Sequence, residues 1–277
     1  KNSMPELPEV ETIARQLNAI LPGKKIKTVT GIDGEFAGKE ISGVTRKAKV
    51  ITVSFGNWDK KLMIHLKMTG QLIYVDDQQR VVGGHPTADW VSELPSKHTK
   101  VIIEFSDGSK LFFNDLRGFG WMKLVDSIKY QEYSIKQPPD VVDGEFSQDY
   151  FRAVLSKTSR PIKLVLMDQT KMGGIGNIYA NDALFWAGVD PRRQAKKLEE
   201  KEIDNLYKAI KKVIQLGIKY GGASESDYID VSGMGGKYQE HFLVYKQNGK
   251  KCRNCTSEIK KIKLGGRGTY YCPVCQI

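Results

Sequence analysis

Four cysteines constrain this sequence more than any other feature. They form two Cys-x-x-Cys pairs, Cys252 with Cys255 and Cys272 with Cys275, separated by residues 256–271. Each pair can present two thiolates to one tetrahedral zinc ion, and four thiolates leave no open coordination position for chemistry. The pattern therefore predicts one structural Zn²⁺. Two disulfides are the alternative, which the metal-type spacing of all four cysteines disfavours.

The residues between the two pairs have the pattern of a hairpin. Apolar positions at 259–264 and the segment 269–271 (TYY) are separated by residues 265–268 (GGRG). We expect two strands joined at this glycine-rich turn, with Arg267 at its tip. Residues 248–277 are therefore predicted to form a zinc ribbon.

The charge balance indicates a polyanionic partner. The chain has 277 residues, with 43 Lys and Arg against 32 Asp and Glu, for a net charge of +11. Nucleic acid is the first candidate and an acidic membrane the second, although a ribosomal or tRNA-binding protein would have a similar composition. No stretch approaches the ~18 apolar residues of a membrane span. The first six residues (KNSMPE) lack the apolar core of a secretion signal, so an intracellular, reducing compartment is expected.

Hydrophobic periodicity divides the chain into domains. Three-and-four spacing of apolar residues predicts a helix over residues 8–21, and short β-branched or aromatic runs such as 49–55, 101–105 and 110–113 predict a β-rich part, most simply a sandwich. Further helices are predicted over residues 147–157, 160–170, 177–187 and 198–219. We expect a first domain over 5–130, a linker over 131–146 around the QPPD of residues 137–140, a helical domain over 147–247 and the ribbon.

Several motifs in chain order resemble the bacterial formamidopyrimidine-DNA glycosylases. They are PELPEVET at 5–12, RKAK at 46–49, HLKMTG at 65–70, DLRGFG at 115–120, GIGNIY at 174–179 and the cysteine ribbon. The resemblance implies an α+β fold, with an N-terminal β-sandwich behind a leading helix and a C-terminal helix–two-turn–helix domain plus the four-cysteine zinc ribbon. The related endonuclease VIII branch has the same architecture but typically starts differently.

The resemblance implies catalytic roles for Pro5, Glu6, Lys49 and Arg267. The amine of an N-terminal proline attacks the sugar C1′ and forms an iminium, and an α-amine with a pKa near ~8 is more often unprotonated than lysine. Glu6 is the general acid, Lys49 serves β-elimination, and Arg267 binds phosphates and serves δ-elimination. By themselves, Pro5 could be a rigid lead-in and Glu6 a partner of the helix dipole.

An extension departs from this pattern, because residues 1–4 (KNSM) precede the proline. An acylated Pro5 nitrogen could not form an iminium, since its lone pair is delocalised into the carbonyl group. We expect Met4 to be the natural start and to be removed.

Other residues match DNA-binding positions of the family. Met68, Arg117 and Phe119 correspond to the residues that fill the hole left by an extruded base, although core packing is the ordinary role of such Met and Phe side chains. Asn177, in the glycine turn, is expected to contact a phosphate. Weaker phosphate contacts are expected from His65, His98, Arg160 and Lys163.

Two further departures concern the helical domain. The polar segment 221–237 corresponds to a lesion-capping loop, but its ASES at 223–226 differs from the expected pattern, so no base contact is assigned. Asp182 stands where a glutamate is expected, a change that should slightly alter local packing.

The resemblance implies a bifunctional glycosylase and AP lyase for oxidised purines. Its expected partner is double-stranded DNA that contains oxidised purines or abasic sites. We expect the protein to be a monomer that acts at the nucleoid in the bacterial cytoplasm, with no membrane involved. The alternatives are an endonuclease VIII-like enzyme for oxidised pyrimidines and, if Pro5 stays capped, a non-catalytic protein that binds damaged DNA.

Overall fold

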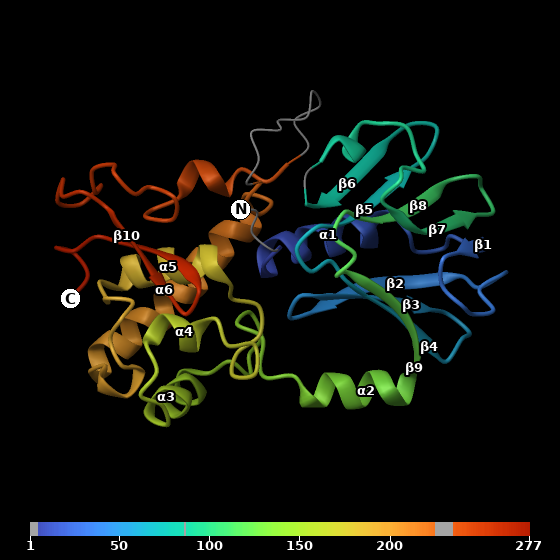
Figure 1. Ribbon diagram of the computed structural model, residues 1–277. Helices are drawn as coiled ribbons and strands as arrows, with labels where there is room; N and C mark the ends of the chain where they lie inside the picture. The colour runs from blue at the N-terminus through green and yellow to red at the C-terminus, as the bar shows by residue number, and fades with distance from the viewer. Residues whose placement is uncertain (1–4, 86, 225–234) are drawn as a thin grey trace. The chain divides into compact units, whose positions relative to one another are not determined.

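The chain divides into two units, and the computed structural model describes residues 5–85, 87–224 and 235–277. One unit spans residues up to 136 together with the described ends of the 221–237 segment, and the other spans residues 137–220 and 238–277 (Figure 1). The helices are α1 (Leu7–Ile20), α2 (Ser127–Lys136), α3 (Gln148–Ser156), α4 (Ile162–Leu166), α5 (Asn177–Ala187) and α6 (Glu200–Lys219), with short 3₁₀ turns at Ala88–Trp90, Ala195–Lys197 and Tyr238–His241.

The leading helix α1 forms because its apolar residues recur on one face. Val10, Ile13, Ala14 and Leu17 are buried, and a proline occupies the first turn, where its missing N–H costs nothing. The helix ends at Ile20, just before a Pro-Gly pair. The predicted helix over residues 8–21 is therefore confirmed.

Nine antiparallel strands of the first unit form two sheets. The strands are β1 (Ile26–Thr30), β2 (Ile41–Lys47), β3 (Val50–Phe55), β4 (Lys60–His65), β5 (Gly70–Val75), β6 (Arg80–Gly84), β7 (Thr99–Phe105), β8 (Lys110–Asp115) and β9 (Trp121–Asp126). One sheet has the order β1-β7-β8-β5-β6 and the other β2-β3-β4-β9. Buried side chains from both sheets and from α1 form one core, so the predicted β-sandwich is confirmed (Figure 1).

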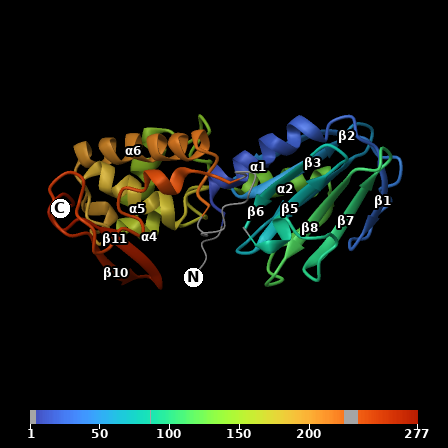
Figure 2. The same ribbon diagram turned by 90° about the horizontal axis from the view of Figure 1, so that it is seen from above.

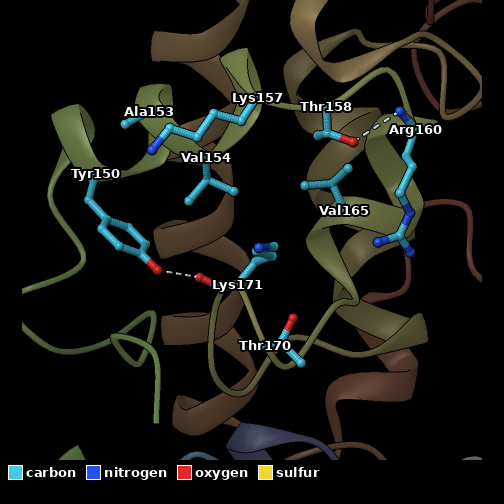
Figure 3. A pocket seen from close by; sticks show the side chains of 9 residues that line it. All are labelled: Tyr150, Ala153, Val154, Lys157, Thr158, Arg160, Val165, Thr170 and Lys171. Carbon is cyan, nitrogen blue, oxygen red and sulfur yellow. Dashed lines mark hydrogen bonds between the residues drawn. The ribbon is translucent and has the colours of Figure 1, made fainter. Parts of the chain in front are cut away.

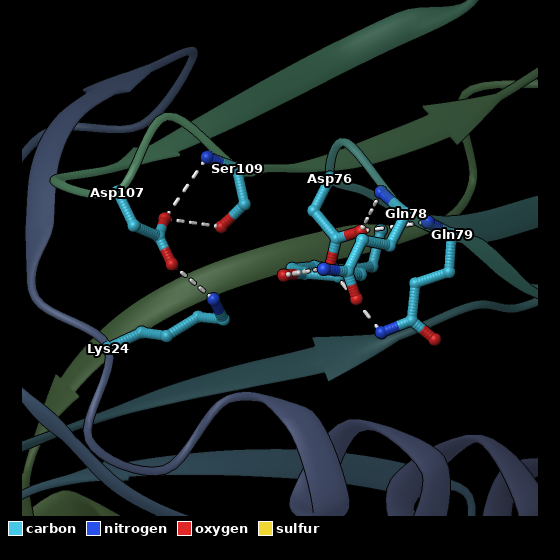
Figure 4. Close-up of polar contacts among 7 residues, drawn as sticks. Lys24, Asp76, Gln78, Gln79, Asp107 and Ser109 are labelled. Atoms are coloured by element: carbon cyan, nitrogen blue, oxygen red, sulfur yellow. Dashed lines mark hydrogen bonds and ion pairs between the residues drawn. The ribbon is translucent and has the colours of Figure 1, made fainter.

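Acidic side chains hold two of the hairpin turns in this sandwich. Asp76 accepts the backbone N–H groups of Gln78 and Gln79 at 2.9 and 2.8 Å between β5 and β6. Asp107 accepts the backbone N–H of Ser109 at 3.0 Å between β7 and β8, and it also contacts the ammonium of Lys24 (Figure 4). Such turns fix the register of the strands that they join.

The second unit is built around α5, which packs against both α6 and the ribbon hairpin (Figure 2). The hairpin consists of β10 (Lys260–Leu264) and β11 (Arg267–Tyr271), and Leu264 pairs with Arg267 across the turn. Gly265 and Gly266 have φ angles of 55° and 77°, the left-handed conformation that a two-residue hairpin turn needs. The helices predicted over residues 147–157, 177–187 and 198–219 and the ribbon hairpin are confirmed, whereas the helix predicted over 160–170 is only the short α4.

The structure differs from the expected domain limits in two places. The expected boundary at residue 130 falls inside α2, a helix with no buried residue that continues into the predicted linker over 131–146 and that its weak apolar periodicity did not indicate. The 221–237 segment, assigned by sequence to the helical domain, has described ends that belong to the N-terminal unit. The physical reason is a hydrogen bond from the backbone N–H of Ala223 to Glu9 of α1.

Candidate active site and nucleic-acid interface

Pro5 and Glu6 lie at the head of α1, and both are buried. Glu6 is the N-cap residue, with an exposed fraction of only 2%. Its carboxylate accepts the backbone N–H of Glu9, and the Glu9 carboxylate accepts the backbone N–H of Glu6 at 2.8 Å. This reciprocal capping box satisfies two N–H groups of the first turn and fixes the backbone next to Pro5.

Glu9 also anchors the start of the 221–237 segment. Its Oε1 accepts the backbone N–H of Ala223 at 2.7 Å. Gly222 has a φ of +84°, and a Cβ at this position would lie 2.7 Å from Cγ of Glu9. Only glycine allows the backbone to approach this closely. Residues 225–234, which include most of the expected lesion-capping loop, lie outside the described residues, as do Lys1 to Met4.

Lys49 directly precedes β3, at the turn that joins it to β2, and only 5% of the residue is exposed. The neighbouring Arg46 fixes this turn, because its guanidinium donates to the carbonyl of Ala48 at 2.8 Å and forms an ion pair with Glu11 of α1 at 2.7 Å. Glu11 is a positioning residue that sequence reasoning missed. Its place within the PELPEVET motif was the only available signal.

His65 lies at the end of β4, close enough to Lys49 for the two side chains to interact. Burial first, and then the charges of Lys67 and Lys49, lower the pKa of His65 to about 3. Its Nδ1 accepts the backbone N–H of Lys67 at 2.9 Å. The neutral ring therefore has its hydrogen on Nε2, where it can act as a donor.

Met68, Arg117 and Phe119 come together from two loops at one edge of the sandwich. Nη1 of Arg117 lies 3.2 Å from Sδ of Met68, and its Cζ lies 4.9 Å from the ring centre of Phe119. Phe119 is 56% exposed, an unusual position for a large apolar ring. Core packing therefore does not account for Phe119, and the three side chains form one projecting cluster.

A buried network shapes the two loops that carry this cluster. The hydroxyl of Thr69 donates to Asp115 at 2.5 Å, and its oxygen accepts the backbone N–H of Arg117 at 3.0 Å. Asp115 also accepts the N–H of Gly120 at 2.6 Å and donates its own N–H to the carbonyl of His98 at 2.9 Å. The network places His98 beside the same loops. Thr69 and Asp115 are positioning residues that the sequence did not single out.

In the second unit, Asn177 is the first residue of α5, and its backbone follows the N-cap Gly176. Arg160 is exposed and pairs with Asp168 at 2.6 Å. Figure 3 shows Arg160 at the edge of a hollow of about 330 Å³, which Lys157 and Lys171 also line. The helix start and this cationic rim are both suited to anions.

Lys163 requires a correction, because it is fully buried. Its ammonium donates to the carbonyl of Gly268 at 2.9 Å and to the hydroxyl of Thr269 at 2.7 Å. It therefore does not present a charge to a phosphate in this structure. Lys163 instead holds the hairpin next to the exposed Arg267, as does Asn181 of α5, whose side-chain oxygen accepts the N–H of Tyr270 at 2.8 Å.

Asp182, the expected departure in α5, is fully buried. Its carboxylate accepts the backbone N–H groups of Leu243, Val244 and Tyr245 at 3.1 to 3.2 Å and the hydroxyl of Tyr238 at 3.2 Å. Burial raises the pKa of Asp182 to about 6, because these hydrogen bonds only partly compensate for lost hydration. The shorter acid thus anchors the segment that follows the 221–237 loop.

The four cysteine sulfurs lie within 4.8 Å of one another. The Cys252–Cys275 and Cys255–Cys272 sulfur separations are 3.9 and 3.4 Å, far longer than the ~2.05 Å of a disulfide. Four sulfurs at ~2.3 Å from a tetrahedral zinc would be about 3.8 Å apart. Backbone N–H groups of Asn254 and Cys275 donate to the knuckle sulfurs at 3.4 Å. The donor set fits a structural zinc ion, and the disulfide alternative is wrong.

Three family descriptions match the chain. Residues 4–122 match the formamidopyrimidine-DNA glycosylase N-terminal domain, residues 138–229 the H2TH domain of the same enzymes, and residues 249–277 a zinc finger found in FPG and IleRS. The chain is 37% identical to a formamidopyrimidine-DNA glycosylase of Pelotomaculum thermopropionicum and 35% identical to that of Lactococcus lactis subsp. cremoris, over 99% of each chain.

Solved structures show the same relationship. The Lactococcus lactis Fpg in complex with DNA containing an abasic site has a TM-score of 0.85 and 32% identity, covering 98% of this chain and 99% of that one. The wild-type enzyme of that organism with an oxidised pyrimidine containing DNA has a TM-score of 0.84 at the same identity and coverage.

The fold, the family matches and the ribbon thus define a DNA glycosylase of DNA repair. Within that class, the chain belongs to the formamidopyrimidine-DNA glycosylase family. In the described part of the chain, no helix has both the length and the apolar character to span a membrane.

Proposed function

We propose that this enzyme excises oxidised purines, namely 8-oxoguanine and formamidopyrimidines, from double-stranded DNA and then cleaves the strand as an AP lyase. The arrangement of Pro5 and Glu6 carries the proposal. A secondary-amine residue and a buried carboxyl group stand side by side at the head of α1, on a backbone fixed by Glu9.

The first step requires a free imino group on Pro5. Its lone pair attacks C1′, the bond between C1′ and the base breaks, and the base leaves with the electron pair and the amine proton. Glu6 then gives its proton to the ring oxygen as the C1′–O4′ bond opens, which leaves an iminium between Pro5 and C1′. The burial of Glu6 at the head of the helix, next to Pro5, places its carboxyl group beside the reacting amine.

Strand cleavage uses Lys49 and Arg267. Lys49 takes the C2′ proton, and the 3′ phosphate leaves in the β-elimination; the 5′ phosphate leaves in the subsequent δ-elimination, which Arg267 supports by binding phosphate. Both side chains stand on fixed turns. The ion pair of Arg46 with Glu11 holds the turn of Lys49, and the buried ammonium of Lys163 holds that of Arg267.

The projecting cluster supplies the means of reaching the lesion. An extruded base leaves a hole in the stack, into which Met68 and Phe119 insert while Arg117 donates hydrogen bonds to the partner base. His65, through its Nε2–H, joins Asn177, Arg160 and His98 in contacting phosphates. We propose a monomer with one zinc ion, acting on chromosomal DNA in the bacterial cytoplasm.

Oxidised pyrimidines are a second candidate substrate class, favoured by the Lactococcus lactis complex with an oxidised pyrimidine containing DNA. The experiment compares borohydride trapping and strand cleavage on 8-oxoguanine·C and thymine-glycol·A duplexes. It uses protein that begins at Pro5 and, as the matched control, protein that retains residues 1–4, with both N-termini verified by mass spectrometry.

We expect trapping only by protein that begins at Pro5, and faster excision of 8-oxoguanine than of thymine glycol. Glu6→Gln should lose excision and retain binding. Trapping by protein proven to keep residues 1–4 would remove Pro5 from the mechanism, and faster excision of thymine glycol would favour the pyrimidine class. Tight binding without cleavage by either protein would indicate a non-catalytic damaged-DNA-binding protein.

A further inference from the structure

The outward face of α6 has a row of lysines with no acidic residue among them. Residues 201, 205, 208, 212, 215 and 219 recur at alternating spacings of four and three, and all are exposed. They are Lys201, Asn205, Lys208, Lys212, Gln215 and Lys219, and we call them the α6 crest. The opposite face of the helix, which includes Ile203, Ile210 and Val213, is buried.

The crest differs from an ordinary solvated helix face. Exposed helices usually intersperse charges of both signs, whereas α6 has no acidic residue after Asp204. Lys201 occupies the first turn, where the helix dipole disfavours a cation, so complementing the dipole does not explain the row.

The acids at the start of α6 do not neutralise this row. Glu200 and Asp204 pair with Arg152, and Glu202 pairs with Arg193. None of the four crest lysines forms an ion pair with any residue that the structure describes. Their charge is therefore available to a partner from outside the chain.

Aromatic rings support two of the four ammonium groups. The ammonium of Lys212 lies 3.9 Å from the ring centre of Trp186, a residue of α5 that is itself 45% exposed, and that of Lys219 lies 5.6 Å from the ring of Tyr220. These contacts restrain long side chains and lower the entropy lost when they bind.

The crest lies on the opposite side of its unit from the ribbon. α5 packs against both α6 and β11, and Figure 2 shows α6 and the β10–β11 hairpin on opposite sides of α5. The hairpin that carries Arg267 and the helix that carries the crest thus lie on opposite sides of α5. DNA held against Arg267 leaves the crest uncovered on this unit.

We infer that the α6 crest is a second DNA-binding surface, which holds another segment of duplex through its phosphates. From Lys201 to Lys219 the helix rises about 27 Å, the length of about eight base pairs. A straight row of cations on a rigid helix suits a straight polyanion of uniform charge. No base-specific contact is involved, so the second segment needs no lesion.

The test loads the enzyme with a saturating, unlabelled duplex that contains a tetrahydrofuran abasic-site analogue. A fluorescein-labelled, undamaged duplex of about 20 base pairs, longer than the row of about eight base pairs, is then added. Its binding is followed by fluorescence anisotropy, with stoichiometry from analytical ultracentrifugation. We expect one labelled duplex per loaded enzyme. The logarithm of its affinity should fall with the logarithm of salt concentration with a slope of about −3 to −4, because four phosphate contacts contribute about −0.9 each.

The crest variant K201E/K208E/K212E/K219E reverses the charge of all four lysines in the row. The control variant, K100E/K110E/K129E/K136E, changes four exposed lysines of the other unit, so its net charge changes by the same amount. The crest variant should bind the labelled duplex at least about tenfold more weakly than the control, while both bind the tetrahydrofuran duplex equally. Single Lys→Gln changes in the crest should each reduce the salt slope by about 0.9, which serves as a second readout if the quadruple variant folds poorly.

Two results would overturn the inference. One is a loaded enzyme that takes up no labelled duplex, and the other is equal second-duplex binding by the crest and control variants. If polyglutamate binds the loaded enzyme through the crest where duplex DNA does not, the surface serves an acidic protein instead. None of these outcomes depends on the excision chemistry of Pro5.

Discussion

Glu9 accepts the backbone N–H of Ala223 at 2.7 Å across 214 residues of sequence. The same carboxylate fixes the backbone N–H of Glu6 at 2.8 Å. One side chain therefore connects the expected general acid to the start of the segment that is expected to cap the lesion. We expect a change in this side chain to affect both places, because the two N–H groups donate to the two oxygens of one carboxylate.

Replacing Glu9 with Gln should slow base excision by about 10- to 100-fold, the equivalent of one or two charge-assisted hydrogen bonds of roughly 1.5–3 kcal/mol. Cleavage of a preformed abasic site should fall much less, because no base has to be capped there. Single-turnover rates on 8-oxoguanine and abasic duplexes measure this ratio. The exposed Glu35→Gln is the control, and an equal loss on both substrates would contradict the role of the anchor.

Thr69→Val keeps the side-chain shape but removes the hydroxyl that Asp115 and the N–H of Arg117 use. Unfolding free energy in urea should fall by about 1–3 kcal/mol, since the buried carboxylate of Asp115 loses a donor. The affinity of the variant for lesion-containing duplexes should also fall, because the loops that carry the unchanged Met68, Arg117 and Phe119 lose their support. The exposed Thr45→Val should alter neither quantity, and wild-type affinity in Thr69→Val would show that the network does not position the cluster.

Lys163→Met should destabilise the protein by about 1–3 kcal/mol, because the carbonyl of Gly268 and the hydroxyl of Thr269 lose a buried donor. Arg160→Met, on the surface, should cost far less. Thermal unfolding of the two variants makes the comparison. A Lys163 variant with wild-type stability and a reduced salt dependence of DNA binding would restore the phosphate-contact interpretation.

His65 should stay neutral throughout the physiological pH range, since its pKa is lowered to about 3. The folded-state pKa lies below the unfolded value near ~6.5. The contribution of His65 to the unfolding free energy is therefore fully present above pH ~6.5 and is lost as the pH falls toward about 3. Ring C–H chemical shifts in NMR spectra should remain flat for His65 between about pH 8 and about pH 4.5 in folded protein, and should titrate near pH ~6.5 in urea. A folded-state titration near neutrality would disprove the assigned tautomer.

The contribution of Asp182 to the unfolding free energy should depend on pH in the opposite direction. Its folded-state pKa of about 6 lies above the unfolded value, so its contribution is present at low pH and is lost as pH rises through about 6. The stability difference between wild type and Asp182→Asn should shrink by about 2 to 3 kcal/mol from about pH 4 to about pH 7. Urea unfolding at both values tests it, and a difference independent of pH would count against the raised pKa.

The sequence alone determined the features that depend on local spacing. Apolar periodicity located α1 and α6, short β-branched or aromatic runs located β3, β7 and β8, and paired cysteines located the ribbon. Local rules suffice there because the side-chain period of a helix or a strand, and the Cys-x-x-Cys spacing of a zinc knuckle, are set within a few residues.

Only the tertiary structure decided which side chains share an environment. Lys163 resembled any other cation in the sequence, and burial against Gly268 and Thr269 made it a positioning residue. The pairings of Glu9 with Ala223 and of Thr69 with Asp115 join residues far apart in the chain. Such contacts arise from how sheets and helices pack, and the hydrogen bonds that they satisfy leave no periodic signal in the sequence.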